Sequence, residues 1–133
     1  MLYMLDTNIC SYILKNHPLS VKTRFDEVGA EKLAISSIVL AELYYGAARH
    51  PKGITIRREI DDFTSRLKIM PWNEAAANHY GSIRTVLEKN GTPTGSMDKL
   101  IAAHARSLKA TLVTNNTKHF ECVPELLIAN WVS

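Results

Sequence analysis

Short apolar segments alternate with longer amphipathic segments along most of this chain, and this alternation constrains the fold more than any other feature of the sequence. Residues 1–5, 33–35 and 111–114 have the apolar or β-branched content of buried strands, and 68–70 and 126–128 are shorter candidates. Strands separated by helical segments are typical of parallel sheets, because a parallel connection must cross back over the sheet. The sequence therefore predicts an α/β fold with a central parallel sheet of four to five strands flanked by helices.

The amphipathic segments carry apolar residues three or four positions apart, as one face of a helix requires. Candidate N-terminal caps are the pair Thr7 and Asn8, the pair Ser36 and Ser37, and Asn73. A loop with Gly91, Pro93 and Gly95 separates the last two predicted helices. The predicted helices cover residues 7–15, 18–28, 36–48, 54–67, 73–90 and 97–108.

Length and composition limit what such a fold can be. A chain of 133 residues with 46% hydrophobic content can bury one core, so we expect a single domain over residues 1–133. Sixteen Lys and Arg against 13 Asp and Glu give a net charge of +3, which permits a phosphate-rich partner without demanding one. Cys10 and Cys122 lack metal-ligand spacing and favour reduced thiols in a cytoplasmic protein. No segment resembles a signal peptide or a membrane span.

Several polar side chains fall where parallel sheets place their chemistry, beyond the carboxyl ends of the strands. Asp6 follows the first strand directly, and Asn115 and Asn116 follow the strand at 111–114. Asp98 stands in the first turn of a predicted helix, and Glu42 lies inside an otherwise apolar helix. Taken singly, each has an ordinary explanation as a cap, a helix-dipole partner, an exposed helix residue or a turn former. Together they would deliver several oxygen donors to one crevice, which suits Mg²⁺ or Mn²⁺.

Other common catalytic arrangements have no support in the sequence. The five histidines are scattered, and no Cys or His pair has the spacing of zinc ligands. His104 has no evident partner and is interpreted as a packed or surface residue rather than a general base. Neither a GxSxG elbow nor a GxxxxGK phosphate loop is present, which excludes the usual serine-hydrolase and P-loop sites.

Four blocks of residues, in order along nearly the whole chain, resemble the PIN-domain family. Met4-Leu5-Asp6-Thr7-Asn8 resembles its opening signature. Ile35-Ser36-Ser37 followed by Ala41-Glu42-Leu43-Tyr44-Tyr45-Gly46 resembles its second acidic block. Asp98-Lys99-Leu100-Ile101-Ala102-Ala103-His104-Ala105 resembles the third, and Leu112-Val113-Thr114-Asn115-Asn116 with Phe120 completes the match. Each block is weak by itself, whereas four in register are specific.

The resemblance implies a PIN fold, an acidic cluster that binds Mg²⁺ or Mn²⁺, and endonucleolytic cleavage of single-stranded or looped RNA. Within the family, the compact build resembles the VapC toxins of type II toxin–antitoxin systems. That likeness implies a VapB-type antitoxin, a homodimer and inhibition of translation. Similarity to the enteric members suggests transfer RNA as the substrate, with the anticodon stem-loop of the initiator as a candidate.

The resemblance also implies roles for particular residues. Asp6 and Asp98 would be the principal metal ligands, and Glu42 would complete or bridge the site. Many relatives carry a fourth acid where this chain has Asn116, which leaves a second metal site open, and Glu121 is an alternative donor. The side chains expected to orient the acids through hydrogen bonds are Thr7, Asn8, Ser36 and Asn116.

Two kinds of surface are candidates for binding partners. The apolar faces of residues 18–28 and 54–67 are candidate surfaces for a dimer or an antitoxin helix, although plain core packing explains them equally well. Basic side chains either follow an RNA backbone or form a solvated face, the candidates being Arg49, Lys52, Arg57, Arg58 and Lys99.

Two other functions stay open at this point. One is a metal-dependent phosphatase or phosphotransferase with an aspartate nucleophile, although such enzymes usually carry a second Asp where this chain has Asn8. The other is a non-catalytic RNA-binding PIN module, against which the joint presence of Asp6, Glu42 and Asp98 speaks.

Overall fold

The computed structural model describes residues 1–92 and 94–132, so Pro93 of the predicted loop and Ser133 of the predicted domain lie outside the described residues. Its centre is a five-stranded sheet with strand order β3-β2-β1-β4-β5, and each neighbouring pair is parallel. This confirms the predicted α/β fold with a parallel sheet. The strands are β1 (Tyr3–Leu5), β2 (Leu33–Ser36), β3 (Lys68–Met70), β4 (Thr111–Val113) and β5 (Leu127–Ala129).

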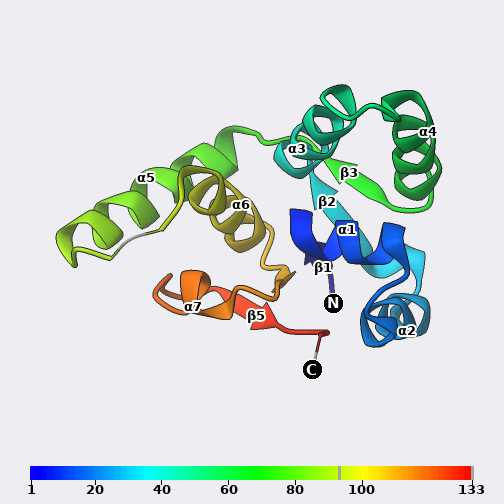
Figure 1. Cartoon of the computed structure of the whole chain (residues 1–133). Coiled ribbons are helices and arrows are strands. Elements are labelled where there is room, and N and C mark those ends of the chain that lie inside the picture. The colour runs from blue at the N-terminus through cyan, green and yellow to red at the C-terminus, as the bar shows by residue number, and fades with distance from the viewer. Residues whose placement is uncertain (93, 133) are drawn as a thin grey trace.

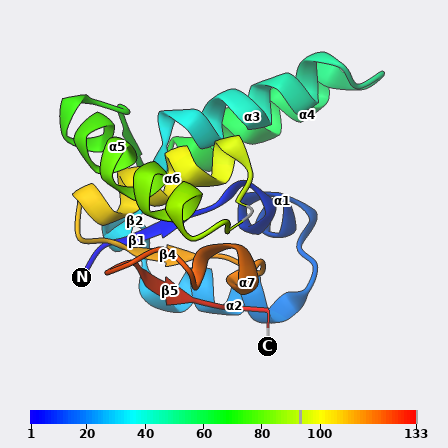
Figure 2. The same ribbon diagram turned by 90° about the vertical axis from the view of Figure 1, so that its left-hand side faces the viewer.

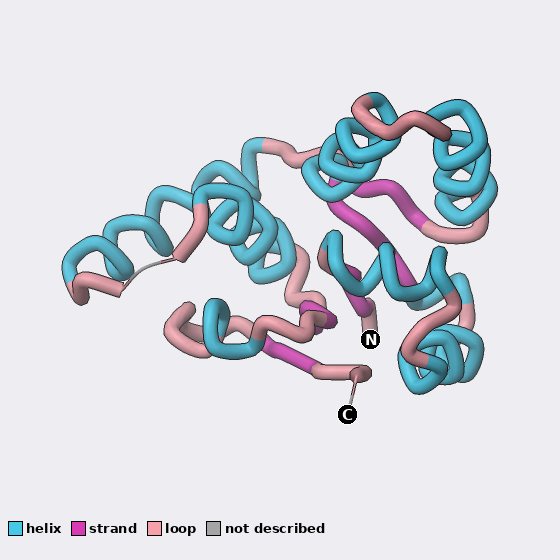
Figure 3. The backbone as a smooth tube through the Cα atoms, in the orientation of Figure 1, coloured by secondary structure: helices cyan, strands magenta, loops and turns pink. Residues whose placement is uncertain are grey.

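Helices cover both faces of this sheet. In Figure 1, α5 and α6 lie on one side of the strands and α1 and α2 on the other, and Figure 3 shows the central strands between these two groups of helices. The α3 and α4 helices lie side by side and project away from the strands (Figure 2). None of the described helices is long and apolar enough to cross a membrane. The helices are α1 (Thr7–Lys15), α2 (Leu19–Val28), α3 (Ser37–Ala48), α4 (Gly53–Thr64), α5 (Glu74–Lys89), α6 (Ser96–Ser107) and α7 (Thr117–Phe120), with a 3₁₀ turn at Ala30–Lys32.

The three central strands form the core of the sheet. Every residue of β2 and β4 is buried, as are Met4 and Leu5 of β1, whereas the edge strands β3 and β5 are largely exposed or half-buried. A parallel strand covered by helices on both faces has no solvent side, so its sequence is a continuous apolar run rather than an alternating one. This is why the central strands could be recognised in the sequence.

The connectivity fixes where a site can form. From β1 the chain moves outward to β2 and then β3, and it then returns to the opposite side of β1 to form β4 and β5. The connections that leave β1 and β4 therefore run in opposite directions, which opens a crevice at the carboxyl ends of these two neighbouring strands. Asp6 follows β1, and Thr114 follows β4.

The ends of several elements differ from the prediction. Thr7 and Asn8 were expected to cap α1, but the cap is Asp6, because its extended backbone places the carboxylate over the N–H of Ile9. The predicted caps Ser36 and Asn73 are confirmed. The α4 helix ends at Thr64 instead of Leu67, since the chain must extend again for β3 at Lys68. Neither α7 nor the 3₁₀ turn was predicted, because elements of three or four residues show no hydrophobic periodicity.

The two cysteines are free thiols, as the sequence predicted. Cys10 is buried within α1, where burial raises the pKa of its thiol well above the ordinary value. A buried thiol with a raised pKa is a small apolar core residue rather than a nucleophile.

Candidate active site

Asp6 is a buried carboxylate at the end of β1, and only 5% of the residue is exposed. Its Oδ1 accepts the backbone N–H of Ile9 at 2.9 Å, and the hydroxyl of Thr114 forms a second hydrogen bond to the side chain. The backbone N–H of Asp6 donates to the carbonyl of Val113 at 3.1 Å, which continues the pairing of β1 with β4. Neighbouring strands and the first turn of α1 thus fix this carboxylate in place.

The surroundings of Asp6 raise its pKa from 3.8 to about 6. Burial is the largest cause, and the negative charges of Asp98 and Glu42 add to it, while the hydrogen bonds from Thr114 and Ile9 act in the opposite direction. Asp98 and Glu42 are therefore close enough to repel Asp6 electrostatically. The three acids predicted for one site are thus near enough for the charges of Asp98 and Glu42 to act on Asp6.

Glu42 reaches this site from α3. The hydroxyl of Thr7, in the first turn of α1, donates to Oε1 of Glu42 at 2.5 Å. This contact joins two residues that are 35 positions apart in the sequence, and it is a hydrogen bond of the kind predicted for Thr7. Glu42 is half-buried, so part of its carboxylate remains accessible.

Asp98 lies in the first turn of α6, and 29% of its side chain is exposed. Its Oδ2 lies 3.4 Å from Nδ1 of His119, which α7 supplies. Gly95 lies directly beside the carboxylate, because a Cβ atom at this glycine would stand 3.5 Å from Oδ2 of Asp98. Sequence reasoning did not select His119, whose one signal was its place three residues after Asn116.

Ser36 has a different role from the one predicted. It is fully buried at the end of β2, where its hydroxyl oxygen accepts the N–H of Ile38 at 3.1 Å and lies 2.7 Å from Nδ1 of His104. Among the described residues, no hydrogen bond joins Ser36 to a carboxylate. His104 is 1% exposed, and burial lowers the pKa of its imidazole, which confirms it as a packed residue.

The other predicted residues are partly or fully exposed. Asn116 precedes α7, and its backbone N–H donates to the hydroxyl of Thr114 at 3.0 Å. Asn8 is exposed in α1, and Glu121 is exposed at the C-terminal end of α7. Thr114 was recognised only as the end of a strand, yet its hydroxyl contacts both the Asp6 side chain and the Asn116 backbone.

The donor set fits a divalent cation in its chemistry. Asp6, Asp98 and Glu42 all offer carboxylate oxygens, and the most buried of them, Asp6, has a raised pKa that a neighbouring cation would lower. As the side chains stand, no three His, Cys, Asp or Glu residues in the ranges 1–92 and 94–132 converge on one point. Mg²⁺ is commonly held by one or two carboxylates together with waters and substrate phosphates, so a cage of three protein ligands is not required.

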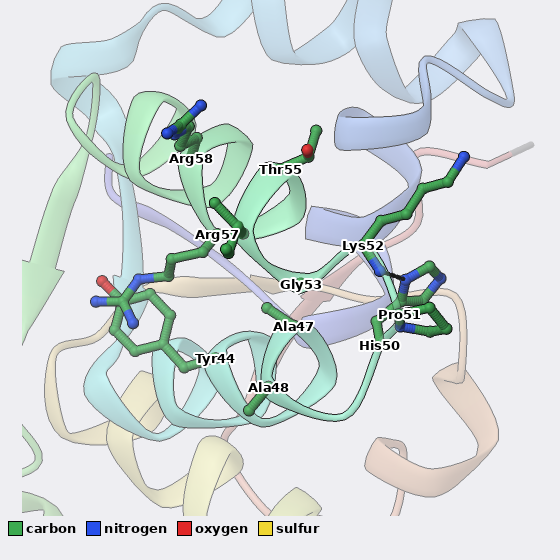
Figure 4. Close-up of a pocket in the computed structure, with 11 residues that line it drawn as sticks. Tyr44, Ala47, Ala48, His50, Pro51, Lys52, Gly53, Thr55, Arg57 and Arg58 are labelled. Atoms are coloured by element: carbon green, nitrogen blue, oxygen red, sulfur yellow. Dashed lines mark hydrogen bonds between the residues drawn. The ribbon is translucent and has the colours of Figure 1, made fainter.

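A separate groove of about 850 Å³ lies on the α3–α4 pair. Figure 4 shows Lys52, Arg57 and Arg58 among its lining residues, whereas the three site acids are not among them. The Arg57 guanidinium stacks 3.6 Å from the centre of the Tyr44 ring and bonds to Asp61 at 3.2 Å. Lys52, Arg57 and Arg58, predicted as candidate RNA contacts, therefore share one surface, on which Arg57 already has partners.

The chain matches the family model of the PIN domain over residues 3–126. Ribonuclease VapC2 of Rickettsia felis is 45% identical over 132 residues, which cover 98% of both chains. The tRNA(fMet)-specific endonuclease VapC of Shigella flexneri is 43% identical over 129 residues, which cover 97% of both chains.

Solved structures agree with this assignment. The VapBC2 complex of Rickettsia felis, bound to a promoter DNA fragment, has a TM-score of 0.93 and 44% identity, over 98% of this chain and 99% of that one. The DNA-bound VapBC complex of Salmonella typhimurium has a TM-score of 0.93 and 40% identity, with the same coverage. The chain therefore belongs to the PIN-domain family and, within it, to the VapC ribonucleases of the VapBC toxin–antitoxin systems.

Proposed function

We propose that this VapC ribonuclease is a Mg²⁺- or Mn²⁺-dependent endonuclease that cleaves transfer RNA, and that its toxicity is the resulting inhibition of translation. The observation that carries the proposal is the buried Asp6 carboxylate, which lies beside Asp98 and Glu42 at the carboxyl ends of β1 and β4. Acids that repel one another in a confined crevice are unfavourable alone and favourable around a cation.

Asp6 and Asp98 would be the principal ligands, with Glu42 completing the site. A divalent ion held there supplies Lewis-acid stabilisation of the charge on the scissile phosphate. Thr114 and the N–H of Ile9 hold the Asp6 carboxylate, and Thr7 holds that of Glu42, so these oxygens are oriented before RNA binds. The relatives named above are ribonucleases or endonucleases, which favours the nuclease over the phosphotransferase alternative.

Transfer RNA is proposed as the substrate on the strength of particular relatives. The VapC proteins of Shigella flexneri and Salmonella typhimurium, 43% and 40% identical to this chain, are named tRNA(fMet)-specific endonucleases. We infer that the substrate is the initiator transfer RNA, cleaved in its anticodon stem-loop. This RNA is the first one to test. The net charge of +3 suits a polyanionic substrate.

A VapB-type antitoxin is the proposed partner, since the two solved structures named above are VapBC complexes. The α3–α4 groove is a candidate surface for a segment of the antitoxin, because the groove is lined by Ile54, which is 75% exposed, beside basic side chains.

We also propose that the protein forms a homodimer, which light scattering of the purified protein would test. A monomer at micromolar concentration would contradict that part of the proposal.

The nuclease proposal is tested with purified protein and initiator transfer RNA, in Mn²⁺, in Mg²⁺ and in EDTA. We expect cleavage that requires the metal and falls about 100-fold or more in Asp6→Asn and in Asp98→Asn. The matched control is Asp26→Asn, an exposed acid in α2, which should cleave at the wild-type rate. Circular dichroism establishes that each variant is folded.

Four results would count against the proposal. Cleavage in EDTA, or full activity with Asp6 and Asp98 both changed, would contradict the metal mechanism. Cleavage of other RNAs with transfer RNA left intact would contradict the proposed substrate, whereas the proposed nuclease activity would still hold. Metal binding without cleavage of any RNA would favour a binding module.

A further inference from the structure

His119 is held at the rim of the site by the way α7 is anchored. The next residue, Phe120, is fully buried and fixes the short helix to the core. The carbonyl of His119 accepts the hydroxyl of Thr94 at 3.5 Å, which ties α7 to the loop before α6. The imidazole lies near the first turn of α6, where Nδ1 is 3.4 Å from Oδ2 of Asp98.

This separation is close to that of two donors on one metal ion. Two ligands that each lie about 2.1 Å from an octahedral ion, at right angles to one another, are roughly 3 Å apart. The Nδ1–Oδ2 distance of 3.4 Å reaches that value with a small side-chain rotation. Both side chains are partly exposed, 56% for His119 and 29% for Asp98, so an ion can reach the space between them.

The other donors at this rim are less well placed. The backbone N–H of Asn116 donates to Thr114, but among the described residues its side chain forms no hydrogen bond to a site acid. Glu121 is exposed directly after the last residue of α7. Among the described residues of α7 and its two ends, His119 is the one whose side chain lies within 4 Å of a predicted metal ligand.

We propose that His119 is a metal ligand of this site, supplying Nδ1 to the ion that Asp98 helps to hold, and that it makes the site prefer Mn²⁺ to Mg²⁺. This inference rests on the proposed metal-dependent function. Imidazole is a poor ligand for Mg²⁺, which prefers oxygen, and a better one for the first-row transition metals. A site with both carboxylate and imidazole ligands therefore binds Mn²⁺ more tightly than Mg²⁺, whereas a site with carboxylates alone would discriminate less between the two ions.

The competing explanation is a surface contact between His119 and Asp98 that fastens α7 to α6. Such exposed pairs contribute little to stability and bind nothing. The two explanations differ in one observable, which is whether nitrogen is bonded to the bound metal.

The experiment is electron spin echo envelope modulation of Mn²⁺ bound to the full-length protein without a histidine tag. We expect modulation from a directly coordinated nitrogen in the wild type, and its loss in His119→Ala and in His119→Gln. His17→Gln is the matched control, because His17 is an exposed histidine in a different part of the chain, and it should keep the modulation. Calorimetry should show Mn²⁺ binding about 10-fold weaker in His119→Ala and Mg²⁺ binding changed by less than about twofold.

The outcomes separate this inference from the proposed function. Mn²⁺ binding that requires Asp98 but shows no nitrogen modulation would overturn the role of His119 and leave the carboxylate site standing. Modulation that persists in His119→Gln and is lost only in His119→Ala would indicate a packing role and overturn the ligand assignment. Mn²⁺ binding that is unaffected by Asp6→Asn and Asp98→Asn would overturn both proposals.

Discussion

Asp6 and Asp98 were predicted for the same site, yet they lie in very different surroundings. Asp6 is 5% exposed and receives hydrogen bonds from Thr114 and from the first turn of α1. The Asp98 side chain is 29% exposed and faces His119 on a four-residue helix. The sheet centre thus supplies a rigid and desolvated carboxylate, whereas the rim supplies donors that can rearrange when an ion or RNA arrives.

This comparison predicts that hydrogen bonds at the sheet centre contribute more to stability than those at the rim. Ser36→Ala removes the cap of α3 and leaves the buried Nδ1 of His104 without its partner. We expect a loss of about 2–4 kcal/mol in the free energy of unfolding, measured in urea by circular dichroism. Asn116→Ala, at the rim, leaves the backbone hydrogen bond to Thr114 in place and should cost less than about 1 kcal/mol. Equal losses in the two variants would contradict the larger contribution of the sheet centre to stability.

The desolvation of Asp6 predicts a dependence of stability on pH. Because its pKa is raised from 3.8 to about 6, the folded state binds this proton more tightly than the unfolded state does. The stabilisation is fully present below about pH 4 and is lost as the pH rises through about 6, a difference of up to about 3 kcal/mol. Asp6→Asn keeps a capping side chain without the charge, so it should exceed the wild type in stability by about 2–3 kcal/mol at pH 8.

Urea unfolding in EDTA at pH 4 and pH 8 measures this effect. The two proteins should be about equally stable at pH 4, and saturating Mn²⁺ should reverse their order at pH 8, because only the wild type binds the ion well. Asp26→Asn serves as the control for an exposed acid. If Asp6→Asn were the less stable protein at both pH values in EDTA, the carboxylate would not be desolvated as described.

The difference between the sheet centre and the rim also explains how much could be predicted from the sequence. The central strands and the place of Asp6 followed from continuous apolar runs and from the polar residue that ends one of them. The contact of Thr114 with Asp6 depends on the register of β1 against β4, in which Leu5 pairs with Val113, and one strand read alone does not show that register.

The rim was harder to predict for a related reason. His119 reaches Asp98 through α7, a helix of four residues whose sequence carries no periodic signal. That the acids share one crevice was inferred from their places in the predicted α/β fold and from the family resemblance. Local spacing could not show it, because Glu42 and Asp98 come from different helices. Residues that tertiary packing brings together leave no local pattern in the sequence.

The smallest expected effect concerns Glu121, the alternative donor considered from the sequence. Glu121 ends α7 two residues after His119, and its backbone N–H donates to the carbonyl of Thr117 at 2.9 Å. Residues two positions apart on a helix point in nearly opposite directions, so His119 and Glu121 do not both face Asp98. Glu121→Gln should therefore change the rate of transfer RNA cleavage and the affinity for Mn²⁺ by less than about twofold. A loss of about tenfold would require α7 to turn when the ion or the RNA binds. Glu121 would then replace His119 in the site.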